Sequence, residues 1–343
     1  MWSKLRGWTV ANRPLLLRIG LAIGWLLLIT FAHWRLNFEH GTARVINIGY
    51  MPVVTNLAAP LLDYTSRENE KVRFRALKFS SFAEMAEALR NDQIQVAFMI
   101  APLSVVMRQQ GEDVKVVMIG NRHESTLVAR ADLGITHVDE LVGRTIAVPM
   151  RFSGHNLIVR RLLEENHLEG RVRVVEMNPP DMASAMVSGV LDAYYVGEPF
   201  AAQTLYTGHS TLVQYVEDVW PKFIGNLVVV RSDLIERDAD LVQMMVESSA
   251  RTGVWAEKNP HEVARIASRY WNQSPEVIYY ALTRPEKRVR YNLYEPKEEE
   301  MQEMADMMVA FGLIESNNIE GLVEPRFARS VNLEGAEDLE RGR

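Results

Sequence analysis

The sequence QVAFMIAPL at residues 95–103 and the sequence DAYYVGEPF at residues 192–200 repeat one pattern 97 residues apart. In each, a short apolar run typical of a buried strand ends in a proline-containing turn that opens a helical pattern. The same shift places Met85 on Met182, inside the helical pattern that precedes each run. We interpret this repeat as two similar α/β lobes within one chain.

Short apolar runs alternate with helical patterns on both sides of this pair, from residue 44 onward. Strands are expected at residues 44–49, 72–77, 95–100 and 114–119, and again at 145–148, 172–175 and 193–196. Between two of them, Ser81-Phe-Ala-Glu84 is a capping box that predicts a helix beginning at Phe82. Strands that alternate with helices predict mostly parallel sheets with helical crossovers.

The pattern changes after Asn226, which sets the expected domain boundaries. One further strand at 227–230 is followed by helical patterns at 233–258, 261–270, 275–282 and 296–311. We therefore expect lobe 1 to comprise residues 44–129 and 227–325, with the helical part packed back on it. Lobe 2 comprises residues 130–226, and residues 326–343 form a polar tail. The chain would cross between lobes near Arg130 and near Asn226, and two crossings act as a hinge.

The N-terminal 35 residues have the composition of a membrane-targeting segment. Lys4, Arg6 and Arg13 precede an apolar run from Pro14 to Ala32 that only Arg18 interrupts. Its uninterrupted part has 14 residues, between a signal-peptide core and the roughly 20 residues of a full span. We expect residues 1–35 to be an uncleaved membrane helix or a cleaved signal peptide. The basic flank places the rest of the chain outside the cytoplasm, anchored in the cytoplasmic membrane if the helix is retained.

Composition excludes several classes of function. A net charge of −6 argues against a nucleic-acid binder, which needs a basic surface. The absence of cysteine excludes disulfides, thiolate metal sites and cysteine nucleophiles. The eight histidines are scattered without metal-ligand spacing, so we expect no metal, no cofactor and no catalytic residue.

Ligands of open parallel sheets bind beyond the carboxyl ends of the strands, so the cleft between two such sheets is the natural site. The segments that follow the expected strands supply hydroxyl, amide, histidine, arginine and carboxylate groups. The candidate ligand-binding residues are Tyr50, Thr55, Asn56, Ser80, Ser81, Pro102, His123, Arg151, Ser153, His155, Asn156 and Glu198.

Donors outnumber acceptors among these groups. Helix openings at Ser81 and at Ser153–Asn156 present free amide groups and the positive end of the helix dipole. Arg151 and His155 stand in the second of these segments. The pattern predicts a small anionic solute, or a zwitterion with an anionic end.

Six segments together resemble the substrate-binding proteins of the nitrate/sulfonate/bicarbonate (taurine-type) ABC importers. They are GYMP (49–52), FMIAPL (98–103), FSGHN (152–156), PPDM (179–182), VGEPFAA (196–202) and LVVVRSDLI (227–235). Ser153, His155 and Asn156 match the family's helix-opening motif, and Pro102 matches a position whose neighbours line the cleft. The resemblance implies the two-lobed periplasmic-binding-protein (type II) fold, a non-enzymatic role in solute uptake, and ABC permease subunits as partners.

Two alternatives remain open at this stage. One is an enzyme on the same fold, related to the synthases of pyrimidine precursors. The other is a membrane-anchored sensor whose lobes report ligand binding to a membrane partner.

Overall fold

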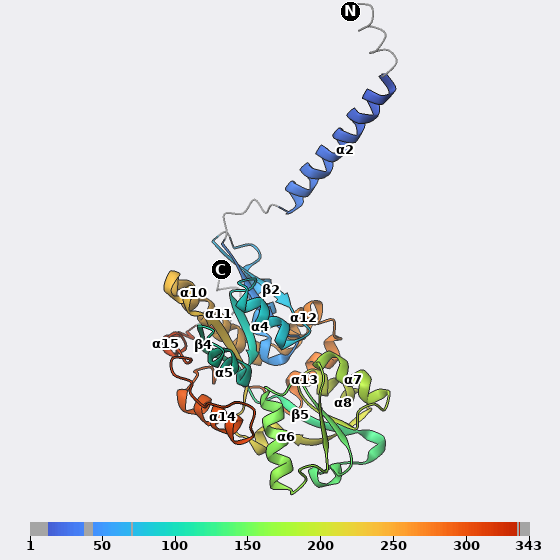
Figure 1. Cartoon of the computed structure of the whole chain (residues 1–343), viewed down its shortest axis with the longest axis vertical. Coiled ribbons are helices and arrows are strands. Elements are labelled where there is room, and N and C mark those ends of the chain that lie inside the picture. The colour runs from blue at the N-terminus through green and yellow to red at the C-terminus, as the bar shows by residue number, and fades with distance from the viewer. Residues whose placement is uncertain (1–12, 38–43, 70, 335, 337–343) are drawn as a thin grey trace, which may run out of the picture. The chain divides into compact units, whose positions relative to one another are not determined.

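The computed structural model describes residues 13–37, 44–69, 71–334 and 336. The chain divides into two compact units, Met1–Ala43 and Arg44–Arg343. The first unit contains helix α2 (Arg13–Asn37). Figure 1 shows the ribbon of the whole chain.

Helix α2 lies where the sequence predicted a membrane helix, but that prediction is not supported. No helix in the described part of the chain combines the length and the hydropathy that crossing a bilayer requires.

The second unit is an α/β structure built on two five-stranded sheets. The first sheet has the order β2-β1-β3-β10-β4 and the second has the order β7-β6-β8-β5-β9. Strands of the first sheet are β1 (Arg44–Tyr50), β2 (Val72–Lys78), β3 (Val96–Ile100), β4 (Val114–Arg122) and β10 (Ile224–Arg231). Those of the second are β5 (Ser125–Arg130), β6 (Thr145–Val148), β7 (Arg173–Glu176), β8 (Ala193–Gly197) and β9 (Ser210–Tyr215).

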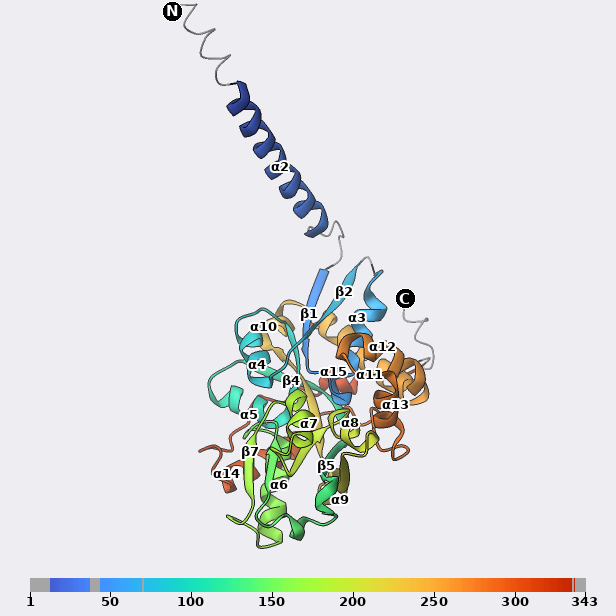
Figure 2. The ribbon, with the colours of Figure 1, turned by 90° about the vertical axis from the view of Figure 1, so that its right-hand side faces the viewer.

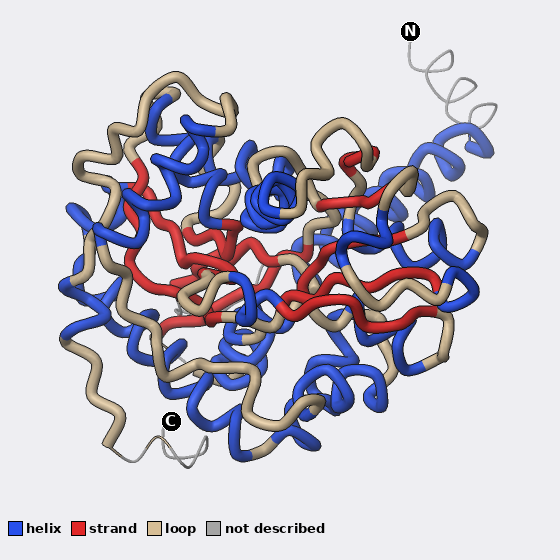
Figure 3. The backbone as a smooth tube through the Cα atoms, turned by 90° about the horizontal axis from the view of Figure 1, so that it is seen from below, coloured by secondary structure: helices blue, strands red, loops and turns tan. Residues whose placement is uncertain are grey.

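Helices flank both sheets, as Figure 3 shows with the strands in red and the helices in blue. The helices between β1 and β10 are η1 (Val54–Asn56), α3 (Ala58–Ser66), α4 (Phe82–Arg90), α5 (Ala101–Gln109), η2 (Ala131–Leu133), η3 (Val138–Leu141), α6 (Gly154–Glu165), α7 (Pro179–Val187), α8 (Phe200–Tyr206) and α9 (Val216–Val219). Those after β10 are α10 (Ser232–Arg237), α11 (Ala239–Lys258), α12 (Pro260–Trp271), α13 (Pro275–Thr283), α14 (Glu298–Ala310) and α15 (Arg326–Arg329).

The 97-residue repeat is confirmed in the elements themselves. A shift by 97 residues carries β3 onto β8 and α4 onto α7 with the same bounds. A matching hydrogen bond accompanies β3 and β8, because the side chain of the residue before each strand accepts from a backbone amide of the neighbouring parallel strand, β1 or β6. Gln95 Oε1 lies 3.0 Å from Asn47 N, and Asp192 Oδ2 lies 2.9 Å from Thr145 N.

The prediction of mostly parallel sheets needs a correction. β10 pairs antiparallel with β3 and β4, and β5 pairs antiparallel with β8 and β9. Each of these strands arrives from the other sheet. Each therefore begins beside the carboxyl ends of its neighbouring strands, and it must run antiparallel to them.

The passages between the sheets also differ from the predicted ones. β4 ends at Arg122 and β5 begins at Ser125, so the first passage lies at His123–Glu124, before Arg130. The second lies between β9 and β10, before Asn226. The predicted tail contains α15, whose Phe327 is buried at 3% exposure, while residues 337–343 lie outside the described residues.

Helix starts follow local sequence signals. Ser81 caps α4 as predicted, although its hydroxyl accepts from Ala83 N, at 3.2 Å, instead of from the amide of Glu84. Asp238 caps α11 and splits the single helix expected at 233–258 into α10 and α11. Helices α11 and α12 pack beside α3 (Figure 2), and α13 packs against α12 and α8. Val246, Ile266 and Ile278 of these helices are buried in one core with residues of the first sheet.

Gly120 in β4 allows η1 to approach the sheet closely, which gives a test of the fold. A Cβ atom built on Gly120 would lie 2.7 Å from the carbonyl oxygen of Thr55. We expect Gly120→Ala to lower the free energy of unfolding by about 1–3 kcal/mol, because η1 must move. Urea unfolding measures this, with Gly24→Ala as control, since nothing lies within 4 Å of that position. Equal stability of both variants would contradict the close approach.

Candidate functional site

A buried polar layer lies where the chain passes between the two sheets. We define this inter-sheet layer as Thr55, Asn56, Asn121, Glu124, Ser125, Thr126, His155, Glu198, Asn226 and Arg288. Each member is at most 6% exposed. So many buried polar side chains are costly unless they are hydrogen-bonded to one another or to a ligand.

Glu198 lies at the centre of the layer. One carboxylate oxygen accepts from the Thr126 hydroxyl at 2.9 Å, and the other accepts from Ala202 N at 2.6 Å. Its carbonyl oxygen accepts from Val54 N at 2.7 Å, which joins the loop after β1 to the turn after β8. This hydrogen bond directly links the end of β8, in the second sheet, to the loop that follows β1 of the first sheet.

Arg288 supplies the layer's cation from the segment after α13. Its guanidinium donates to Glu217 at 2.7 Å, to Thr126 at 2.8 Å and to the carbonyl of Ser125, and lies 3.6 Å from Glu198. Removing one partner of such a buried pair costs about 3–5 kcal/mol. Arg288 therefore fixes the carboxylates of the layer in place.

Glu124 brings a second carboxyl group against Glu198. It accepts a hydrogen bond from Glu198 N. Burial, and next the negative charge of Glu198, raise the pKa of Glu124 well above its usual value. Burial also raises the pKa of Glu198, whereas Arg288 opposes that shift. Glu124 therefore keeps its proton to higher pH than an exposed glutamate does.

The side chain of Asn56 is engaged in hydrogen bonds within the protein. Its Nδ2 donates to the carbonyls of Met51 and Phe98, both at 3.2 Å, and its Oδ1 accepts from Asn226 at 2.6 Å. These bonds hold the loop after β1 against β3 and β10.

His155, at the start of α6, is neutral at physiological pH. Burial lowers its pKa to about 3. Its Nε2 lies 2.9 Å from the Ser125 hydroxyl, and its ring meets Tyr195 and Phe223 edge-on. The imidazole can therefore act as a hydrogen-bond donor or acceptor, but not as a cation.

Several buried polar atoms at this place have no partner among the described residues. They are both side-chain polar atoms of Asn121, Nδ1 of His155 and the hydroxyl of Tyr195. A buried polar atom left unpaired costs about 1–3 kcal/mol. Such atoms are suited to a bound solute that supplies the missing hydrogen bonds.

Four of the twelve candidate residues lie in the layer, namely Thr55, Asn56, His155 and Glu198. Ser153 and Asn156 are buried beside it, but they bond to each other and to the carbonyls of Met150 and Arg151. Pro102 is buried at the start of α5. Their contact with a ligand stays a prediction.

The other five candidates lie apart from the layer. Arg151 is exposed and its guanidinium stacks over Phe152, 4.9 Å from the ring centre. Ser80 is exposed and Ser81 caps α4. The hydroxyl of Tyr50 points to the carbonyl of Tyr270, 3.4 Å away, and the ring of His123 bonds to Pro221 O at 2.7 Å.

Sequence reasoning did not select four important groups. Asn121 and Glu124 lie in the same segment as the candidate His123, after an expected strand, and Tyr195 lies near the end of the strand before Glu198. The rule that ligand-binding residues cluster at strand ends could therefore have identified these three residues. Arg288 lies in the charged run EKRVR at 286–290, which carries no local signal of burial.

The described residues contain no group of three or more histidine, aspartate or glutamate side chains arranged to hold a metal ion. The geometry instead favours reversible binding through hydrogen bonds.

The depressed pKa of His155 predicts a pH dependence of stability. The unfolded histidine takes up a proton below pH 6.5, whereas buried His155 does so only near pH 3. Its contribution to stability is therefore present above pH 6.5 and is lost as the pH falls. We expect this group to cost about 1.4 kcal/mol between pH 7.5 and pH 5.5.

Urea unfolding of the wild type and of His155→Phe at both pH values measures the effect. Glu124 acts in the opposite direction, because a raised carboxyl pKa favours folding as the pH falls. The effect of Glu124 on stability is the same in the wild type and in His155→Phe, so it cancels when the pH responses of the two proteins are compared. An equal pH response of the two proteins would show that His155 is not buried as a neutral group.

The order of the two sheets and the buried layer between them define an α/β fold of the periplasmic-binding-protein type. Residues 41–270 match the NMT1-like family, and the chain belongs to that family.

A curated relative and two solved structures are similar to the chain. The taurine-binding periplasmic protein of Escherichia coli (strain K12) is 25% identical over 200 residues, which cover 55% of this chain and 62% of that protein. The match thus spans less than two thirds of the relative. The periplasmic nitrate-binding protein NrtA from Synechocystis PCC 6803 superposes with a TM-score of 0.77 at 13% identity, covering 85% of this chain and 89% of that one. The ligand-binding component of an ABC-type import system from Staphylococcus aureus, with zinc bound, gives 0.76 at 21% identity, covering 84% and 99%.

Proposed function

We propose that the chain is the solute-binding component of an ABC importer and that it acts outside the cytoplasm. The unpartnered buried atoms of Asn121, His155 and Tyr195 carry this proposal, because each of them needs a hydrogen-bonding partner that a bound solute would supply. The names of the relatives support it, since they are binding proteins for taurine and nitrate and a component of an import system. ABC permease subunits are the partners that this role requires.

The charges of the layer favour a zwitterionic solute over a simple anion. Arg151 is exposed and His155 is neutral, so neither group expected to receive an anion places a positive charge in the layer. Arg122, at the end of β4, is paired with Glu300. Arg288 faces both Glu198 and Glu217. A solute with one cationic end would be attracted by the surplus carboxylate, while its anionic end accepts hydrogen bonds from Asn121 and Tyr195.

Binding would close the two sheets on the solute about the two passages between them. These passages lie side by side, because His123 N donates to Phe223 O at 3.4 Å and the His123 ring bonds to Pro221 O. We propose that the lobes turn about His123–Glu124 and residues 220–224 as a hinge.

We propose that residues 1–35 direct the chain to the membrane for export, through the basic flank and the apolar stretch that follows it. The N-terminal residue of the protein purified from its host tests how this happens. A start near His33 indicates a cleaved signal peptide, whereas a start at Met1 indicates a retained anchor.

Two neighbouring tyrosines of β8 provide a matched test of the solute site. The hydroxyl of Tyr195 has no described partner, whereas that of Tyr194 bonds to Phe200 O at 3.0 Å and to Thr204 at 2.6 Å. We expect Tyr195→Phe to weaken solute binding by about five- to tenfold and to raise the melting temperature of the unliganded protein, because the unpaired buried hydroxyl is removed. Tyr194→Phe should lower stability by about 1 kcal/mol and leave affinity unchanged.

Calorimetric titration with taurine, ethanesulfonate and nitrate measures the affinities. Ethanesulfonate lacks the ammonium group of taurine, so tighter binding of taurine supports a zwitterion site. Wild-type affinity in Tyr195→Phe would show that the solute binds elsewhere. Equal affinity for taurine and ethanesulfonate would exclude a role for the carboxylates.

A further inference from the structure

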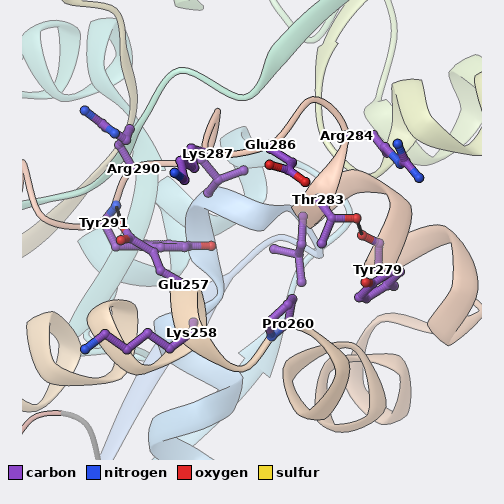
Figure 4. A pocket seen from close by; sticks show the side chains of 13 residues that line it. Glu257, Lys258, Pro260, Tyr279, Thr283, Arg284, Glu286, Lys287, Arg290 and Tyr291 are labelled. Carbon is purple, nitrogen blue, oxygen red and sulfur yellow. Dashed lines mark hydrogen bonds between the residues drawn. The ribbon is translucent and has the colours of Figure 1, made fainter.

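An open cavity of about 540 Å³ lies away from the inter-sheet layer, and no member of the layer lines it. It is formed by the end of α11, the start of α12, the end of α13 and the segment 284–291 (Figure 4). This volume falls within the range of small-molecule sites, roughly 300–1,000 Å³.

Cations outnumber acids around this cavity. Lys258, Arg284, Lys287 and Arg290 line it, against Glu257 and Glu286. Glu257 is already engaged, because its Oε1 accepts from Tyr291 N at 2.7 Å. The cavity therefore has a surplus of positive charge.

Three of these cations differ from many arginines in the described part of the chain. Arg44, Arg90, Arg130, Arg231 and Arg265, for example, all pair with acids within 4 Å. Across the part of the chain that the structure describes, no acid lies within that distance of Arg284, Lys287 or Arg290. Cations that line one cavity without an acid beside them repel each other, and a multiply charged anion bound there reduces that repulsion.

We propose that this cavity is a second ligand site, which binds a small phosphate-bearing anion. Guanidinium groups bind phosphate through two parallel hydrogen bonds, and lysine adds a point charge. Figure 4 shows Lys287 beside Arg290 on one side of the cavity and Arg284 on the other, with Glu286 between Lys287 and Arg284. A phosphate group bound next to Lys287 and Arg290 can be contacted by both side chains.

The site lies on the outer side of the segment that supplies Arg288 to the layer. Arg288 reaches the layer, and the Tyr291 hydroxyl donates to Val54 O at 2.9 Å, next to the Val54–Glu198 bond. Lys287 and Arg290 of the same segment line the cavity. A bound anion would therefore brace the segment that connects the C-terminal helices to both sheets.

Titration of the full chain with inorganic pyrophosphate at constant ionic strength tests the site by calorimetry. We expect binding of one equivalent, weakened at least about tenfold in the double variant Lys287→Gln/Arg290→Gln. The control Arg160→Gln/Arg171→Gln removes the same charge from exposed positions outside the cavity. It should bind as the wild type does.

Three results would overturn the proposal. They are no heat of binding at millimolar pyrophosphate, equal weakening in the control variant, and loss of binding in Tyr195→Phe, which would place the anion in the inter-sheet layer. Unchanged pyrophosphate binding in Tyr195→Phe keeps this site separate from the proposed solute site, whatever that site binds.

Sedimentation with phosphatidylglycerol vesicles, abolished by the cavity double variant, would identify a lipid headgroup as the source of the phosphate. Binding of pyrophosphate without vesicle binding would name a soluble phosphate.

Discussion

The buried guanidinium of Arg288 is the interaction on which the centre of this protein depends. A charge with 6% exposure is tolerated only with full compensation, and Arg288 obtains it from Glu217, Glu198, Thr126 and the carbonyl of Ser125. These partners come from the second sheet and the segments beside it, whereas Arg288 comes from the chain after α13. The C-terminal helices share a core with the first sheet, and Arg288 ties the segment after α13 to the second sheet as well.

The layer around Arg288 combines satisfied and unsatisfied groups. Asn56, Glu198 and Thr126 are held by short hydrogen bonds, so their positions are fixed. Asn121, Tyr195 and Nδ1 of His155 keep buried polar atoms without described partners. A rigid frame with a few open hydrogen-bonding positions is the arrangement that a binding site requires, because the frame pays little entropy when a ligand arrives.

Topology explains why this layer lies where it does. Each sheet receives one strand from the other, β5 or β10, and that strand enters among the carboxyl ends of its neighbours. The passages at His123–Glu124 and between β9 and β10 therefore run through the space where loops after the parallel strands meet. Polar loop residues and the two passages thus occupy one region of the molecule.

Sequence periodicity determined the elements and their repetition, because burial on a sheet imposes apolar runs and helix caps impose Ser81 and Ser153 locally. The 97-residue repeat, the position of His155 and Glu198 after their strands, and the family resemblance all follow from such local patterns. Tertiary structure decided the strand directions at β5 and β10, the engagement of Arg122 with Glu300 and the exposure of Arg151. It also decided the burial of Arg288, since a charged run near a turn has the same sequence signature whether it faces water or a distant carboxylate. Contacts between residues more than 100 positions apart leave no periodic trace, and for that reason the charge of the site could be read only from the folded chain.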